Sequence, residues 1–77
     1  MIDINKQIEY WKSGAESDLE SAEILINNNK LLQGLFFCHL YIEKILKALV
    51  VKQIKDIPPK THNLKYLMVL AKVDLTE

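Results

Sequence analysis

The chain has 77 residues, about half of them apolar (49%), and its ten lysines balance ten acidic residues, so the formal net charge is zero. This composition excludes a disordered chain, the length allows one domain (1–77), and no apolar run approaches the ~20 residues of a membrane span. The chain contains no arginine, which weakens the case for a nucleic-acid partner, and Cys38 is its single cysteine, so we expect a cytoplasmic protein without an intrachain disulfide.

The first predicted element is an amphipathic helix over residues 3–28. Its apolar residues recur about every 3.67 positions, close to the period of an unstrained α-helix. They are Ile4, Ile8, Trp11, Ala15, Leu19, Ala22 and Ile26. The opposite face, expected to be solvated, carries Lys12, Ser13, Glu16, Asp18, Glu20 and Glu23. Gly14 lies within this helix and indicates the close approach of another helix.

The second predicted helix covers residues 31–54 and is apolar around most of its circumference. Asn27, Asn28 and Asn29 end the preceding helix, and the short connection forces an antiparallel hairpin. One broad arc carries Leu32, Leu35, Phe36, Cys38, Ile42, Ile45, Leu46, Leu49, Val50 and Ile54. The other side carries Phe37, Leu40, Tyr41, Lys44, Lys47, Val51, Lys52 and Lys55. We expect the arc to be buried by neighbouring elements, and the lysine side is itself partly apolar.

A short third helix follows Pro58 and Pro59, with Thr61 or Asn63 as its N-cap. It is about 10 residues long, too short to cover the seam between two helices of more than twice its length. Apolar surface on the second helix is therefore expected to remain uncovered. Asp74 or Thr76 would cap a further helix, so either the chain belongs to a larger bundle or another subunit completes its core.

These elements predict an all-α fold, an antiparallel up-and-down bundle of two long helices and a short third. The side chains expected to be buried are Trp11, Leu19, Phe36, Leu46, Leu49 and Leu64. Charge is segregated along the chain: residues 13–29 hold four acidic side chains and no lysine, whereas residues 30–77 hold eight lysines. An antiparallel hairpin would place these opposite charges together.

Two groups of polar residues are candidates for chemistry. His39 and Glu43 lie one helical turn apart. They form either a polar contact within the bundle or an acid–base pair, and His62 could join them. The stripe Phe37, Tyr41, Lys44 and Lys47 either binds a nucleotide or packs against a helix, with the lysine stems covering apolar surface. No cofactor, metal-ligand motif or nucleophile motif is expected.

Several motifs resemble the HEPN domain family (higher eukaryotes and prokaryotes nucleotide-binding). They extend over essentially the whole chain: Trp11, Ala15, Asp18-Leu19 and Ala22; then Phe36, His39, Ile42-Glu43-Lys44 and Leu46-Lys47-Ala48-Leu49; then Pro59, Thr61-His62-Asn63-Leu64 and Leu67. The resemblance implies a helical bundle that commonly dimerises. Such domains pair with a minimal nucleotidyltransferase in toxin–antitoxin systems, and members bind nucleotides or cleave RNA without a metal.

The ribonuclease members carry an arginine followed four to six residues later by a histidine, and this chain has no arginine. The resemblance therefore implies a non-catalytic binding module, with nucleotide or partner contacts at Glu43, Lys44, Lys47 and His62. His39, one turn from Glu43, is a further candidate contact residue. The alternatives are the N-terminal fragment of a HEPN ribonuclease toxin and a ligand-free helical oligomerisation domain.

Overall fold

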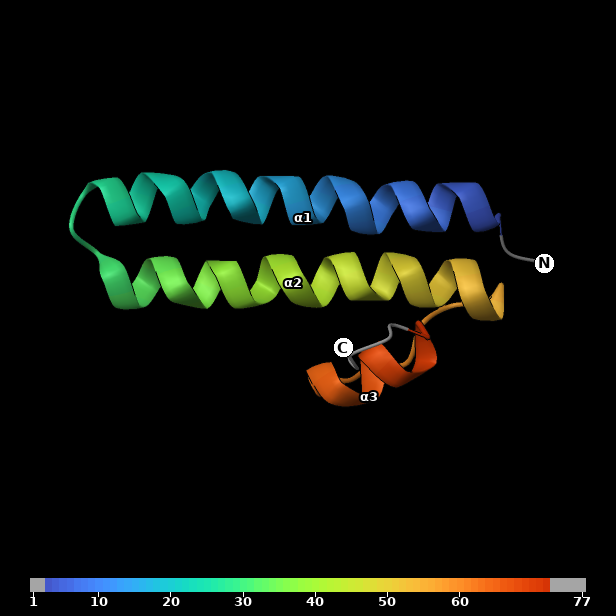
Figure 1. Cartoon of the computed structure of the whole chain (residues 1–77). Coiled ribbons are helices and arrows are strands. Elements are labelled where there is room, and N and C mark those ends of the chain that lie inside the picture. The colour runs from blue at the N-terminus through green and yellow to red at the C-terminus, as the bar shows by residue number, and fades with distance from the viewer. Residues whose placement is uncertain (1–2, 73–77) are drawn as a thin grey trace.

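The computed structural model describes residues 3–72, which form three helices and no strand: α1 (Ile4–Asn27), α2 (Leu31–Ile54) and α3 (Leu64–Leu70). Figure 1 shows α1 and α2 as an antiparallel hairpin with α3 beneath the second half of α2. The predicted fold class is confirmed, and the bounds predicted for the second helix are those observed. The third helix has 7 residues and is shorter than expected.

Local hydrogen bonds explain the limits of α1. The Asp3 side chain accepts a hydrogen bond from the backbone N–H of Lys6 (3.1 Å), which caps the first turn. At the other end, the Asn28 side chain donates to the carbonyl oxygen of Ile24 (2.7 Å), and Asn29 adopts a left-handed conformation with φ of 63°. The asparagine run therefore ends the helix in the way the sequence predicts.

The connection from α2 to α3 uses the same kinds of signal. Lys55 terminates α2 in the left-handed conformation (φ 56°), and its N–H donates to the carbonyl of Val51. Of the two predicted caps for α3, Asn63 occupies the N-cap and accepts from the N–H of Tyr66 (3.0 Å). Thr61 supports it by accepting from the N–H of Asn63 (3.1 Å).

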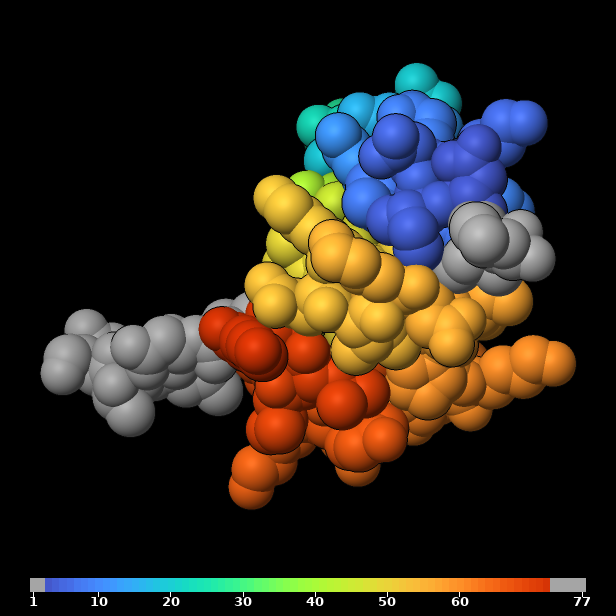
Figure 2. Space-filling view, turned by 90° about the vertical axis from the view of Figure 1, so that its right-hand side faces the viewer, coloured from blue at the N-terminus to red at the C-terminus, as the bar shows by residue number. Residues whose placement is uncertain are grey.

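Helix α2 is the middle layer of the molecule. Seen along the helix axes, α1 lies on one side of α2 and α3 on another (Figure 2). The hairpin closes tightly at Gly34, where an added Cβ would lie only 2.5 Å from Cγ1 of Ile26 on α1. The predicted close approach at Gly14 also occurs, and the neighbouring atoms belong to the Lys44 side chain of α2, with Cδ 3.2 Å from an added Cβ.

The main core lies between α2 and α3. Leu46 and Val50 of α2 are buried with Leu67 of α3 and Ala71, which follows it. Leu64, Met68 and Leu70 pack around this cluster. A second buried layer lies in the hairpin, where Ala15 and Ala22 of α1 are inaccessible to solvent.

Three of the side chains predicted to be buried are exposed, so that part of the prediction is wrong. Leu19 is 37% exposed, Phe36 58% and Leu49 39%, whereas Leu46 is buried and Trp11 and Leu64 are half-buried. Helix α3 packs only against the second half of α2, so it cannot reach Phe36. Leu19 and Leu49 lie on a flank of the hairpin that no described element covers.

Helix α1 packs against the lysine side of α2, as the helix-packing alternative for Lys44 and Lys47 predicts. Lys44 reaches Gly14 and Lys47 reaches the Trp11 ring. Val51, one turn after Lys47, is fully buried. Leu32, Leu35, Phe36 and Ile42 of the apolar arc remain exposed.

No helix within residues 3–72 is long and apolar enough to cross a lipid bilayer. The proposed helix caps Asp74 and Thr76 lie outside the described residues.

Candidate functional site

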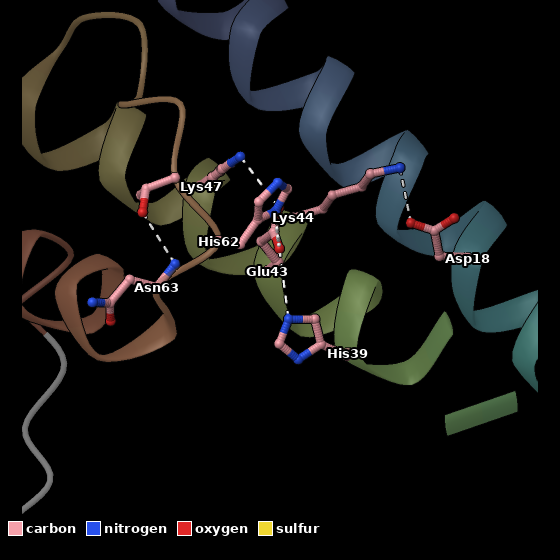
Figure 3. Close-up of polar contacts among 8 residues, drawn as sticks. Asp18, His39, Glu43, Lys44, Lys47, His62 and Asn63 are labelled. Carbon is pink, nitrogen blue, oxygen red and sulfur yellow. Dashed lines mark hydrogen bonds and ion pairs between the residues drawn. The ribbon is translucent and has the colours of Figure 1, made fainter. Parts of the chain in front are cut away.

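A buried carboxylate, Glu43, organises the polar centre of the fold. The His62 ring donates from Nδ1 to both Glu43 oxygens, at 2.9 and 3.0 Å, because a carboxylate can only accept. Lys47 Nζ donates to Oε2 at 3.3 Å, and His39 Nε2 lies 3.7 Å from Oε1 (Figure 3). We call these four residues the Glu43 cluster. The cluster joins α2 to the segment that leads into α3.

The surroundings keep Glu43 ionised. Burial raises the pKa of this carboxyl group, but the hydrogen bonds from His62 and Lys47 and the positive charge of Lys47 outweigh it, so the pKa lies below its ordinary value. A general acid or base works best with a pKa near the operating pH. Glu43 therefore suits the role of a fixed negative charge that holds its neighbours.

Lys47 connects the cluster to α1. Lys47 is 7% exposed, and its Nζ lies 5.0 Å from the centre of the Trp11 ring, within the range of a cation–π interaction. The Lys47 charge is thus shared between a carboxylate and an aromatic face. This contact ties the two long helices together at the level of the cluster.

Lys44 lies on the same α1-facing side of α2 as Lys47 but forms a separate ion pair. Its Nζ is 2.8 Å from Oδ2 of Asp18 on α1. The prediction that Asp18 lies on the solvated face of α1 is wrong, because Asp18 is 8% exposed. Asp18 lies seven residues after Trp11 and four before Ala22, so the helical period places it on the apolar face of α1. This spacing is the sequence signal for its burial.

The structure therefore brings together four of the five candidate contact residues. His39, Glu43, Lys47 and His62 form one cluster, and Lys44 is turned toward Asp18. Within the cluster the histidines reach solvent, with side chains 46% (His39) and 83% (His62) exposed. In residues 3–72 no group of three potential ligands is placed to hold a metal ion.

A shallow pocket of about 290 Å³ lies next to Lys44 on the α1 side. It is lined by Tyr10, Trp11, Ser13, Gly14 and Lys44. Tyr10 and Trp11 pack edge to face with ring centres 5.0 Å apart, and the buried indole N–H of Trp11 has no hydrogen-bond partner. Tyr10 and Trp11 are not among the candidate contact residues predicted from the sequence.

An antiparallel pair of long helices with a short third helix packed on the second defines a small all-α bundle domain. Residues 8–77 match the family model of the HEPN domain. The chain therefore belongs to the HEPN domain family. Searches of curated proteins and of solved structures returned no significant match.

Proposed function

We propose that this chain is a non-catalytic HEPN-type binding module, a single domain over residues 1–77, which docks a protein partner on the uncovered face of α2. The observation that carries this proposal is a group of large apolar side chains left exposed on one helix. They are Leu31, Leu32, Leu35, Phe36, Ile42 and Leu49. Contiguous apolar surface of this kind marks interaction sites in soluble proteins.

Two partner classes fit this face. A second copy of the chain would bury the same surface twice, and a minimal nucleotidyltransferase in a toxin–antitoxin pair is the other partner that family membership suggests. A cytoplasmic location belongs to the same proposal, supported by a single cysteine that has no partner for an intrachain disulfide.

Replacing Ile42 with glutamate tests the docking face. Ile42 is 46% exposed, so the monomer should tolerate the change, whereas a charge buried in an interface should weaken association ~100-fold or more. Light scattering after gel filtration gives the mass. The matched control is Ile24→Glu, an exposed isoleucine on the outer face of α1, which should leave the mass unchanged. Equal association by both variants would exclude the α2 face.

The second expected result is that the chain does not cleave RNA. Metal-independent cleavage needs a proton-transfer group and a cation that stabilises the charged transition state. His39 and His62 are available, but no arginine accompanies them and Lys44 and Lys47 are held by carboxylates. RNA incubated with the purified chain should remain intact. RNA cleavage that is lost in a His62→Ala variant would overturn this interpretation.

Nucleotide contact is a second candidate function, favoured by the pocket beside Lys44. The pocket has an aromatic wall suited to stacking a base, and about 290 Å³ accommodates the base alone, while the Lys44 ammonium stays paired with Asp18. Titration with ATP should quench the fluorescence of Trp11, the single tryptophan. Tyr10→Ala should weaken the binding about tenfold, and Tyr66→Ala, an exposed tyrosine on α3, should not. Unchanged fluorescence at millimolar ATP would exclude this function.

A further inference from the structure

The His62 ring has one nitrogen held by the Glu43 cluster while most of the side chain faces solvent. Nδ1 donates to both oxygens of Glu43, at 2.9 and 3.0 Å, yet the His62 side chain is 83% exposed (Figure 3). When Nδ1 of a neutral imidazole carries the proton, the lone pair lies on Nε2. Among residues 3–72, the polar contacts of this ring are those of Nδ1. The nucleophilic nitrogen of His62 is therefore the one that reagents in solution reach.

Glu43 is placed to stabilise a positive charge that develops on this ring. Its carboxylate is ionised and 4% exposed, and a charge removed from water acts more strongly on a neighbouring group. When Nε2 forms a bond to an electrophile, the ring becomes cationic and keeps its Nδ1–H, so the hydrogen bond to Glu43 strengthens. A group that holds and polarises a nucleophile in this way activates it.

His39 provides a comparison within the same molecule. Its side chain is 46% exposed, so solvent also reaches it. Its Nε2 lies 3.7 Å from Oε1 of Glu43, beyond hydrogen-bond distance. The same carboxylate therefore does less for His39, and an electrophile should react preferentially with His62.

The charges on the segment that carries His62 favour an anionic electrophile. Lys60 precedes the histidine by two residues and Lys65 follows it by three, and both are exposed. In the described part of the chain neither lysine forms an ion pair. The carboxylate that contacts the ring, Glu43, is itself paired with Lys47 at 3.3 Å. Two ammonium groups on one short segment attract a phosphoryl donor more strongly than a neutral acyl donor.

We infer that His62 accepts a phosphoryl group on Nε2 from a phosphoramidate-type donor, with Glu43 as the residue that positions the ring. The Nε2 lone pair attacks phosphorus, and the bond from phosphorus to the donor's nitrogen breaks. The leaving amine keeps that electron pair. No proton moves in this step, because Nδ1 retains its hydrogen and the ring takes up the positive charge. One N–P bond replaces another, so no oxidant or reductant is required.

Reaction of the unmodified chain with potassium phosphoramidate tests the inference without any change to the Glu43 cluster. Intact mass gives the rate, phosphorus NMR identifies the modified nitrogen, and His39→Ala and His62→Ala chains give the rate of each ring alone. His62 should react ~10-fold or more faster than His39, a ratio that one hydrogen bond to a charged group supports. Equal rates, or initial modification at Nδ1 of His62, would overturn the inference.

A double variant tests the role of Glu43. Glu43→Gln/Lys47→Met removes both buried charges together, so the helices should persist by circular dichroism. The rate at His62 should fall to that of His39, whose own rate in the same sample is the control. Fast reaction of His62 in the folded double variant would contradict activation by Glu43. If this variant unfolds, the comparison of the two histidines in the unmodified chain still decides the inference.

The class of electrophile has its own test. Lys60→Ala/Lys65→Ala changes only exposed side chains and should slow the reaction of His62 with phosphoramidate about 2- to 5-fold. The same variant should react at the original rate with diethyl pyrocarbonate, a neutral acylating reagent. Equal slowing with both reagents, or no slowing with either, would contradict the assignment to phosphoryl donors.

Discussion

Replacing Glu43 with alanine should destabilise the fold by ~3–5 kcal/mol, because Lys47 would remain buried without its carboxylate. Glu43 is 4% exposed and Lys47 7% exposed, so both charges are largely removed from water in the folded chain. The change would also release His62, and with it the segment that positions α3. Circular dichroism in increasing urea measures the loss, and a variant at the upper end of this range is already unfolded without urea.

Two controls separate this effect from a general loss of charge. Glu16→Ala removes an exposed carboxylate from α1 and should change the free energy of unfolding by less than ~0.5 kcal/mol. The double variant Glu43→Leu/Lys47→Met removes both buried charges and should recover most of the stability. A loss below about 1 kcal/mol for Glu43→Ala would show that the Glu43 cluster is not a structural anchor.

The same carboxylate gives the stability a predictable pH dependence. The pKa of Glu43 in the folded chain is below its ordinary value near 4.5, so the stabilisation is complete above pH 4.5 and is lost as the pH falls through the folded pKa. The Glu43→Gln variant should not show this part of the acid dependence. An unchanged acid profile in that variant would assign the dependence to other groups.

Truncating Leu46 to alanine is the second large expected effect, at ~2–5 kcal/mol. Leu46 is buried with Val50, Leu67 and Ala71, the cluster that holds α3 on α2. A domain of this size has only ~3–5 kcal/mol of stability from its core, so the variant should be largely unfolded. Val69→Ala, on the exposed side of α3, is the matched control. A Leu46→Ala effect under about 0.5 kcal/mol, the level of a surface site, would show that α3 does not depend on this core.

The helices could be predicted from the sequence because their signals are local. The asparagine run after α1, the prolines after α2 and the Asn63 cap each act within a few residues of the helix end that they set. The sequence also predicts that α3 is too short to cover α2. The exposed side chain of Phe36 on α2 agrees with this prediction.

The packing of α2 could not be predicted because the helix is apolar on nearly every side. Periodicity then does not show which face of α2 packs against α1, and the broad apolar arc is the side that the sequence predicts to be buried. The structure instead packs α1 against the side that carries Lys44, Lys47 and Val51. The buried position of Asp18 was the informative feature, since a carboxylate on an apolar face needs a cation from the facing helix.

The Glu43 cluster was predictable only in part. The four-residue spacing of His39 and Glu43 predicts that they lie one helical turn apart. The sequence offers His62 as a possible third member, and the structure places His62 against Glu43. That contact spans 19 residues and depends on how the chain returns along α2, which no local pattern specifies. The cation–π contact of Lys47 with Trp11 could not be predicted for a similar reason, because it depends on the register between α1 and α2.

Sedimentation equilibrium of the unmodified chain tests most directly the claim that α2 presents a docking face. We expect a mass that shifts from monomer to dimer through the micromolar range, with the shift abolished by Ile42→Glu and retained by Ile24→Glu. A monomer mass that persists to high micromolar concentration, together with sharp and dispersed amide resonances, would show that the three helices form a stable fold without a partner. That result would contradict docking of a second copy on α2.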